Sequence, residues 1–321
     1  MLISVIIPAF NVENYISKAI ESVLKQSYEE IELVIVDDGS TDNTGAIVDS
    51  YSSIDCRVIA VHQKNAGASA ARNVGIDICK GSYVYFLDAD DYLSIDYLKN
   101  IYSYLEKGRY SLICTPYNVL TNKTVNQMCL GKQTTLEKKE ALEELFLYKR
   151  ICWAPFACFY KREAIFNIRF IHKIKFGEDL YFKYQVIKNS KNDLLYVPIS
   201  GHYYNTTRIN SATNSYSITK KIDELDVIRR IMEESPDFKS LLYCKLYLPK
   251  TINYALHVGF NLEENDELIC KKIRKQLINS IFKILLKRKV GLKTKIKLFL
   301  VFMPKFLRAY FWEIIEYSNN R

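Results

Sequence analysis

Residues 31–40 read Ile-Glu-Leu-Val-Ile-Val-Asp-Asp-Gly-Ser, an apolar run that ends in two carboxylates and a turn. An apolar run of this length is typical of a strand that is buried inside a parallel sheet. The pattern returns about fifty residues later, where the apolar residues 83–87 precede Asp88-Ala89-Asp90-Asp91. Ligands collect at the carboxyl ends of parallel strands, and carboxylate oxygens suit Mg²⁺ and Mn²⁺. The two acidic clusters therefore predict a divalent metal and a phosphorylated ligand.

Strands and helices alternate around this stretch. We expect strands at residues 2–7, 31–36, 57–62, 83–87 and 111–117, and helices at residues 16–24, 41–53, 69–79 and 95–106. Such alternation predicts βαβ units in a three-layer α/β/α, Rossmann-like domain with a mostly parallel sheet.

From about residue 121 to 215 the alternation becomes irregular, and we expect this part to pack onto the first half. The expected elements are helices at 136–148 and 178–188 and strands at 156–160, 194–197 and 202–204. Beyond residue 218 strand signals almost disappear. The apolar residues Ile278, Ile281, Phe282 and Leu285 instead recur at helical spacing, which predicts a helical region over 216–321.

Positive charge is concentrated in that last region. Thirteen of the 45 Lys and Arg residues lie between 271 and 308, where there is no Asp or Glu, so the rest of the chain has more acidic than basic groups. Each such cation is worth about 1 kcal/mol near an anionic leaflet. We expect the region to bind an anionic membrane surface; the alternative is a helical bundle with a lysine-rich solvated face. The uncharged stretch 298–304 is too short to span a bilayer.

The bulk composition, 49% hydrophobic and 25% charged over 321 residues, is that of a globular protein. Because the start of the chain shows no leader pattern, we expect a cytoplasmic protein on the inner face of the cell membrane. The eight cysteines form no CxxC pair, as is typical of reduced core cysteines. No nucleic-acid-binding module accompanies the basic tail, so no nucleic-acid partner is expected.

Four motifs occur in order within the first ninety-one residues. They are Ser4-Val5-Ile6-Ile7-Pro8-Ala9-Phe10-Asn11, Val34 to Asp42, Asn65-Ala66-Gly67-Ala68-Ser69-Ala70-Ala71-Arg72-Asn73, and Phe86 to Asp91. Together they resemble the amino-terminal signature of family 2 glycosyltransferases. The resemblance implies a GT-A fold, a nucleotide-diphosphate sugar donor, a Mn²⁺ or Mg²⁺ ion and inversion at the anomeric carbon.

Donor-binding residues follow from the first two motifs. The loop Pro8-Ala9-Phe10-Asn11 follows a strand, and Phe10 offers a ring on which any base can stack. By resemblance, Asp38 accepts a hydrogen bond from N3–H of uracil; the alternative is a loop cap for the next helix. Asp42 is interpreted as a charge at a helix N-terminus.

The last motif resembles the DxD motif, whose carboxylates bind the metal that bridges the donor phosphates. Asp90 is the expected direct ligand, and Asp88 contacts the metal, a metal-bound water or the ribose. Ala89 lies between them, and Asp91 either caps the next helix or touches the ligand. Arg72 faces the diphosphate or fixes the aspartates, unless it is a salt bridge between two elements.

An inverting transfer needs a base at the acceptor hydroxyl. Glu178-Asp179 resembles the ED motif that supplies it, with Asp179 as base and Glu178 in support; the alternative is two acids that open a helix. His202 and Arg208 resemble a loop that closes over the diphosphate and contacts phosphate or metal, although a packed structural histidine is the alternative. Trp153 is a candidate acceptor contact.

These features predict a metal-dependent hexosyl- or N-acetylhexosaminyl-type transferase that moves a sugar from a UDP-sugar to a glycan. We expect the glycan to be lipid-linked, in bacterial capsule, exopolysaccharide or cell-wall synthesis. The predicted division is a GT-A domain over 1–215, with a donor half at 1–120 and an acceptor half at 121–215, and the region 216–321. Oligomers remain possible.

Three other enzyme classes and a non-catalytic role are alternatives. A haloacid-dehalogenase-like phosphatase would have Thr or Val at the position of Tyr92, so the sequence departs from that class. A sugar-nucleotide pyrophosphorylase or a dinucleotide oxidoreductase needs glycines that residues 8–15 lack. A non-catalytic, membrane-docked partner of a glycosyltransferase stays open.

Overall fold

The structure, a computed structural model, describes residues 1–172, 174, 176–208 and 218–256, together with Lys275 and Thr294. The chain divides into two compact units, the first made of Met1–Ile174 and Glu178–Ser215 and the second of Lys175–Gly177 and Tyr216–Arg321. The roles assigned to residues 1–120, 121–215 and 216–321 stay predictions. Apart from Lys275 and Thr294, the basic stretch 271–308 and the apolar stripe at 278–285 lie outside the described residues.

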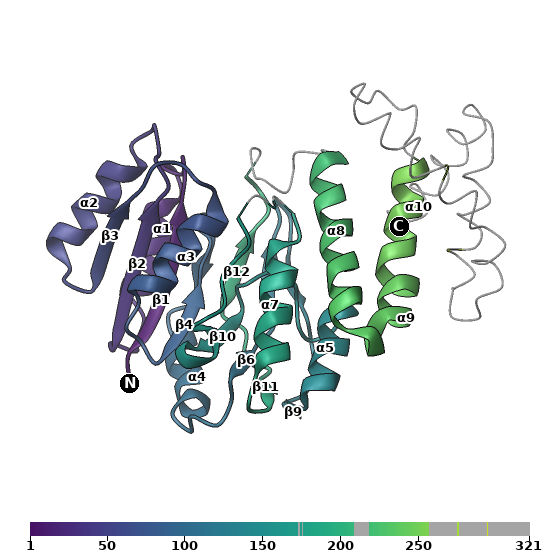
Figure 1. Ribbon diagram of the computed structural model, residues 1–321. Coiled ribbons are helices and arrows are strands. Elements are labelled where there is room, and N and C mark those ends of the chain that lie inside the picture. Colours follow the sequence, from purple (N-terminus) through teal and green to yellow (C-terminus); the bar gives the residue numbers. More distant parts are fainter. Residues whose placement is uncertain (173, 175, 209–217, 257–274, 276–293, 295–321) are drawn as a thin grey trace. The chain divides into compact units, whose positions relative to one another are not determined.

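The first unit begins with the alternation that the sequence predicts (Figure 1). Its elements are β1 (Ile3–Ala9), α1 (Ile16–Leu24), β2 (Ile31–Asp37), α2 (Thr44–Ile54), β3 (Val58–His62), α3 (Ala68–Ile78) and β4 (Tyr83–Phe86). Strands β3, β2, β1 and β4 are parallel neighbours, and Ile6 pairs with both Val34 and Phe86. This register brings the loops after β1, β2 and β4 to one edge of the sheet.

The large sheet has eight strands in the order β3-β2-β1-β4-β10-β6-β11-β9. The added strands are β6 (Leu112–Cys114), β9 (Thr134–Leu136), β10 (Cys158–Lys161) and β11 (Leu194–Tyr196). Strand β10 is antiparallel to both β4 and β6, whereas β11 is parallel to β6 and β9 is antiparallel to β11. The sheet is therefore parallel on the β1 side and mixed on the other.

A second sheet of four strands has the order β5-β12-β7-β8. Its strands are β5 (Tyr92–Leu93), β7 (Tyr117–Leu120), β8 (Val125–Met128) and β12 (His202–Asn205). The sequence did not predict β5, β8 or β9, and the single strand expected at 111–117 is wrong, because β6 and β7 belong to different sheets. The reason for β8 is plain: all four of its residues are exposed, so it carries no apolar pattern.

Helices cover both faces of the parallel strands. On one face Val5 and Ile7 share an apolar cluster with α1, and on the other Ile6 faces α3. Gly75 of α3 comes so near that an added Cβ would lie 2.3 Å from Ile6 Cγ2. Helices α3 and α7 lie on the same side of the sheet (Figure 1). The further helices of this unit are α4 (Tyr97–Leu105), α5 (Lys138–Phe146), α6 (Arg162–Ile165) and α7 (Glu178–Asn189).

The described part of the second unit is helical, as the sequence predicts. It contains α8 (Ile218–Glu234), the 3₁₀ turn Pro236–Phe238, α9 (Lys239–Leu242), the π-helical turn Tyr243–Tyr247 and α10 (Leu248–Leu256). An ion pair of 2.7 Å between Lys250 and Glu224 links α10 to α8. Across the described residues, no helix combines the length and the apolar character needed to span a membrane.

Candidate active site

A pocket of about 450 Å³ opens beside the loops that follow β1, β2 and β4. Its volume is within the range of small-ligand sites. With the exceptions of Asn11 and His202, every residue predicted to bind the donor or the metal lines it. The lining residues are Pro8, Ala9, Phe10, Val12, Asp38, Asn65, Gly67, Ala68, Ala71, Arg72, Asp88, Ala89, Asp90, Tyr204, Asn205 and Arg208. The sequence motifs therefore meet in one pocket.

Asp38 is buried at the end of β2 and orders the loop before α3. One carboxylate oxygen accepts hydrogen bonds from Gln63 Nε2 at 2.6 Å and from Ala66 N at 2.8 Å, and the other accepts from Gly67 N at 2.7 Å. The expected alternative, a cap for the helix after β2, is therefore not what Asp38 does. It caps the later α3 loop, whose backbone lines the pocket, while its contact with a base stays a prediction.

The loop after β1 is held by hydrogen bonds at Asn11 and is open to the pocket at Phe10. Asn11 has a left-handed backbone (φ 49°), which asparagine tolerates better than most residues. Its backbone N–H donates to Ser40 Oγ at 3.0 Å, and its Oδ1 accepts from Thr41 N at 2.8 Å. Phe10, by contrast, is 43% exposed in the pocket lining, so its ring is available to a ligand.

Arg72 joins the two acidic motifs. Its Nη2 donates to Asp88 Oδ1 at 2.9 Å and its Nη1 to Asp179 Oδ1 at 3.0 Å. Burial opposes the charge on Arg72, but Asp179 and Asp88 together raise its pKa above the usual value. Its Nε is buried without a hydrogen-bond partner among the described residues. A single guanidinium on α3 thus places two carboxylates that are about ninety residues apart in the sequence.

Three acidic side chains near Arg72 have pKa values above their usual range. Burial, and then the charge of Asp88, raise the pKa of Asp90, which Arg208 Nη1 contacts at 3.2 Å. Burial and the charge of Asp179 raise the pKa of Glu178 to about 7. Burial also raises the pKa of Asp179. Glu178 and Asp179 do not line the pocket, and Asp179 is connected to it through Arg72.

Asp88 and Asp90 fit a divalent cation by their chemistry. Two pocket-lining carboxylates that repel each other gain from a shared counter-charge, and oxygen donors suit Mg²⁺ and Mn²⁺. Over the described residues, no three His, Cys, Asp or Glu side chains are arranged as a complete metal site.

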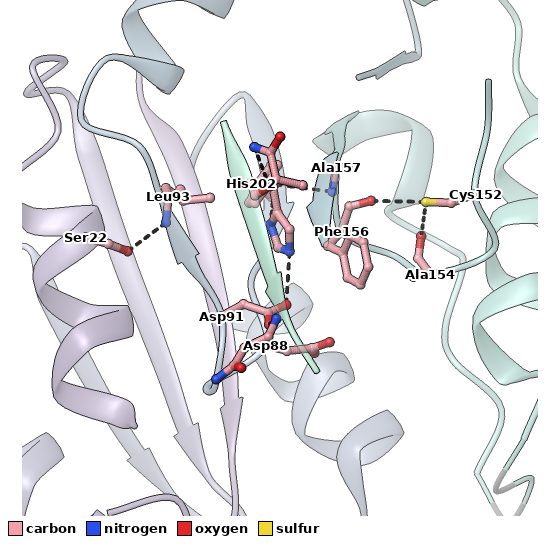
Figure 2. Close-up of polar contacts among 12 residues, drawn as sticks. Ser22, Asp88, Asp91, Leu93, Cys152, Ala154, Phe156, Ala157 and His202 are labelled. Carbon is pink, nitrogen blue, oxygen red and sulfur yellow. Dashed lines mark hydrogen bonds and ion pairs between the residues drawn. The ribbon is translucent and has the colours of Figure 1, made fainter. Parts of the chain in front are cut away.

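His202 lies in the interior, where its ring faces Asp91 (Figure 2), and both of its ring nitrogens are engaged. Nδ1 is 2.9 Å from the Tyr85 hydroxyl and Nε2 is 3.0 Å from Asp91 Oδ2. Its ring stacks on Phe156 at 4.4 Å between centroids. Burial lowers the pKa of His202 to about 4, so the imidazole is neutral. This is the packed structural histidine that was the alternative interpretation, and a metal contact would require one of these bonds to break.

Asp91 is also structural in this arrangement. It is fully buried, and its other oxygen accepts from Asn205 N at 2.8 Å. Burial and Asp88 raise its pKa well above the usual value. Asp91 thus ties the acidic loop to β12, and it neither caps the next helix nor lines the pocket.

Two further outcomes concern residues outside the main motifs. Trp153 donates from Nε1 to Leu145 O at 2.8 Å and does not line the pocket, so its acceptor contact stays a prediction. Tyr204, at the pocket wall, was not predicted, because its only sequence signal was a place in a short strand. Gly67, Ala68 and Ala71 had a readable signal, since small residues permit the close backbone approach that the pocket requires.

The profile of the family described as "Glycosyl transferase family 2" matches residues 4–166. An uncharacterized glycosyltransferase of Haemophilus influenzae is 32% identical over 239 residues, which are 72% of this chain and 92% of that protein. The uncharacterized glycosyltransferase EpsJ of Bacillus subtilis is 32% identical over 59% of this chain and 57% of its own length. For several curated relatives, EpsJ among them, the match spans less than two thirds of their length.

Among solved structures, residues 1–349 of Staphylococcus aureus TarS in complex with UDP-GlcNAc match with a TM-score of 0.71 and 20% identity. The match covers 94% of this chain and 90% of that one. This similarity shows that the fold is a GT-A fold, as the sequence predicts. The chain belongs to glycosyl transferase family 2. The phosphatase, pyrophosphorylase and oxidoreductase alternatives are thereby set aside.

Proposed function

We propose that the protein transfers a sugar from a UDP-sugar to a glycan acceptor with inversion at the anomeric carbon. The observation that carries this proposal is the bridge from Asp88 through Arg72 to Asp179. Arg72 thereby holds Asp88, a candidate metal ligand, and Asp179, a candidate general base, on the two nitrogens of one guanidinium group. The pocket beside them is large enough for a small ligand.

The donor would lie in the pocket with its base near Phe10 and Asp38. Asp38 already accepts three hydrogen bonds, so a contact with a base would add to an oriented carboxylate. Such preorganisation lowers the cost of binding. The matched TarS structure is in complex with UDP-GlcNAc, which supports a uridine nucleotide and a hexose or N-acetylhexosamine donor.

Asp90 and Asp88 would hold Mn²⁺ or Mg²⁺ beside the diphosphate. When bound, such an ion stabilises the negative charge that grows on a departing nucleoside diphosphate. Arg208 and Arg72 line the same pocket and add fixed positive charge there. Their present partners, Asp90 and Asp88, keep both guanidinium groups in place for a phosphate.

Asp179 would take the proton of the acceptor hydroxyl. The ion pair with Arg72 fixes one of its oxygens at 3.0 Å and leaves the other for the acceptor. Glu178 lies next to it with a pKa of about 7, so at neutral pH it is poised to share or relay that proton.

The acceptor would be a glycan of the bacterial surface that is carried on a lipid. Relatives include the B. subtilis protein named minor teichoic acid biosynthesis protein GgaB, 29% identical over 62% of this chain, and TarS, named a poly(ribitol-phosphate) β-N-acetylglucosaminyltransferase. Both names support surface-polymer synthesis. The region 216–321, with the thirteen cations that lie between residues 271 and 308, would hold the enzyme on the anionic inner face of the membrane, where such an acceptor is available.

A thermal-shift titration of the full chain with nucleotides and nucleotide sugars, with and without Mn²⁺, tests the donor and the metal together. We expect UDP and UDP-sugars to raise the melting temperature more than other nucleotides do, and more with Mn²⁺ than without. The Asp90→Asn variant should lose the metal-dependent part alone. If no nucleotide gives a metal-dependent shift, the proposal is wrong.

Co-sedimentation with liposomes tests the membrane proposal separately. We expect more protein to bind vesicles that contain anionic lipid than neutral vesicles, and binding to weaken as salt screens the charges. Binding that is indifferent to anionic lipid would contradict the role given to region 216–321.

A further inference from the structure

Lys183 is a charged residue that the mechanism above does not use. It lies on α7, is fully buried, and donates from Nζ to Cys152 O at 2.9 Å, to Ala154 O and to Cys158 Sγ at 3.3 Å. Within the described residues no carboxylate forms an ion pair with it. Burying an ammonium without one is costly, so its position calls for a reason beyond packing.

The helix itself relates Lys183 to the predicted base. Asp179 precedes Lys183 by four residues, which places the two on the same face of α7, one turn apart. Burial raises the pKa of Asp179, while the Arg72 guanidinium and, more weakly, the Lys183 ammonium lower it. The contacts of Nζ therefore hold α7, one turn after Asp179, against segment 152–158 and leave a positive charge one turn from Asp179.

Segment 152–158 in turn reaches the acidic loop (Figure 2). The Phe156 ring stacks on His202 at an angle of 10°, and Ala157 N donates to the Tyr85 hydroxyl at 3.2 Å. That hydroxyl contacts His202 Nδ1, and His202 Nε2 contacts Asp91. The Asp91 backbone N–H then donates to Asp88 O at 3.0 Å. A continuous buried path thus runs from Lys183 to the predicted metal-binding loop.

The path closes into a ring through Arg72, which contacts both Asp88 and Asp179. The two acidic motifs are therefore joined twice, once at the pocket by Arg72 and once through the interior by Lys183 and segment 152–158. A guanidinium alone would allow both carboxylates to swing about it. The interior connection removes that freedom by fixing the backbone that carries each of them.

We propose that Lys183 is a positioning residue: by holding Cys152 and Ala154, it fixes the Glu178–Asp179 turn relative to the loop at Asp88–Asp91. This inference rests on the proposed function, in which those two segments carry the base and the metal ligands. It adds that their separation is set by the buried lysine, which touches neither donor nor acceptor.

Hydrogen–deuterium exchange of the full chain tests the connection without relying on activity. In Lys183→Met, which keeps a long apolar stem but removes the ammonium, we expect faster exchange both at 178–181 and, across the path, at 88–91. The control is Lys188→Met, the same change on the same helix at a residue outside the path, and it should leave 88–91 unchanged. Faster exchange at 178–181 alone would make Lys183 a local packing residue and overturn the proposal.

Phe156→Leu tests the path from its other side, and it carries the test if Lys183→Met does not fold. It removes the stack on His202 and leaves Lys183 in place. Phe156 contacts His202, which in turn contacts Asp91, so the decisive region is now 178–181. We expect faster exchange there as well; unchanged exchange at 178–181 would overturn the proposal.

The rate provides a second readout, with UDP release from UDP-GlcNAc as the probe. A displacement of about 1 Å can cost about 100-fold in rate, so we expect Lys183→Met to lower kcat by about 10- to 100-fold with an unchanged Kd for UDP. In an Asp179→Asn background the same change should cost almost nothing further, because the group that Lys183 positions is gone. Equal losses in both backgrounds would contradict positioning. If the wild type itself releases no UDP, the proposed donor is wrong, while the exchange experiment still decides the role of Lys183.

Discussion

The parallel and the mixed halves of the first unit place their functional groups in different ways. In the parallel half, strands β1, β2 and β4 end at one edge, and the loops that follow them bring Phe10, Asp38 and Asp88 into the pocket. In the mixed half, Asp179 starts a helix, and buried side chains hold it. Strand order positions the first set, in which Arg72 additionally contacts Asp88, whereas the second depends on Arg72 and, as we propose, on Lys183.

Because the two halves place their groups differently, we expect donor binding and sugar transfer to respond separately to mutation. Changes in the parallel half should alter donor affinity, and changes in the mixed half should alter the rate at unchanged affinity. Arg72 belongs to both, because it contacts one carboxylate from each half.

The largest effect is expected for Asp179→Asn. An amide cannot take a proton from the acceptor, and a general base contributes about 10²- to 10⁴-fold, so kcat should fall by about 1,000-fold. UDP release under saturating donor measures it. Glu178→Gln is the matched control on the same turn, and it should cost less than Asp179→Asn; the reverse order would assign the base to Glu178.

Removing Arg72 should affect both halves. Arg72→Met leaves Asp88 and Asp179 without their shared partner, and because both are partly exposed we expect a loss of about 2 kcal/mol in the free energy of unfolding. Urea titration measures that loss. Arg72→Lys keeps the charge but lacks the fork that bridges two carboxylates, so it should recover part of the stability and little of the rate. Full recovery of the rate by lysine would contradict the bridging role.

A smaller effect, confined to donor binding, is expected for Phe10→Ala. Base stacking on an aromatic ring is worth about 1–3 kcal/mol, so the Kd for UDP should rise by about 10-fold or more. The side chain is 43% exposed, so the melting temperature should hardly change. Calorimetric titration with UDP measures the affinity, and an unchanged Kd would place the base elsewhere.

The smallest effect concerns pH. Hydrogen bonds to Asp37, first, and to Asp49 raise the pKa of His62 above its usual value. A raised pKa means that folding favours the protonated imidazole, so this stabilisation is complete below about pH 6.5 and is lost as the pH rises through the folded-state pKa. Because His62 is 45% exposed, we expect only a few tenths of a kcal/mol. His62→Asn should flatten this part of the pH dependence of stability; an unaltered curve would contradict the assignment.

The sequence predicted the parallel half closely and the mixed half only in part. Apolar runs such as residues 31–36 predict a buried strand from the local sequence alone, so β1 to β4 and their loops were predicted in order. Strand β8 carries no apolar pattern, and the division of 111–117 into β6 and β7 depends on pairing with distant segments. Lys183 gave no signal at all, since only the folded chain shows that its ammonium reaches Cys152 and Ala154.

The motifs predicted which acids gather, but not how each is used. His202 was a candidate for metal or phosphate, yet its nitrogens are taken by Tyr85 and Asp91. Those partners come from β4 and from the turn after it, more than one hundred residues earlier in the chain, and no local pattern encodes that pairing. Spacing along the chain therefore predicts membership of the site better than it predicts roles.

The most direct test of the central claim is a crossed measurement of the Kd for UDP and the rate of UDP release in Asp38→Asn and Asp179→Asn. We expect opposite patterns: Asp38→Asn weakens UDP binding by about 10-fold, the value of one good hydrogen bond to a charged group, with a smaller change in kcat. Asp179→Asn binds UDP as the wild type does and loses its rate. If both variants lose affinity and keep their rate, or if Asp179→Asn transfers at the wild-type rate, the division between a binding half and a catalytic half is contradicted.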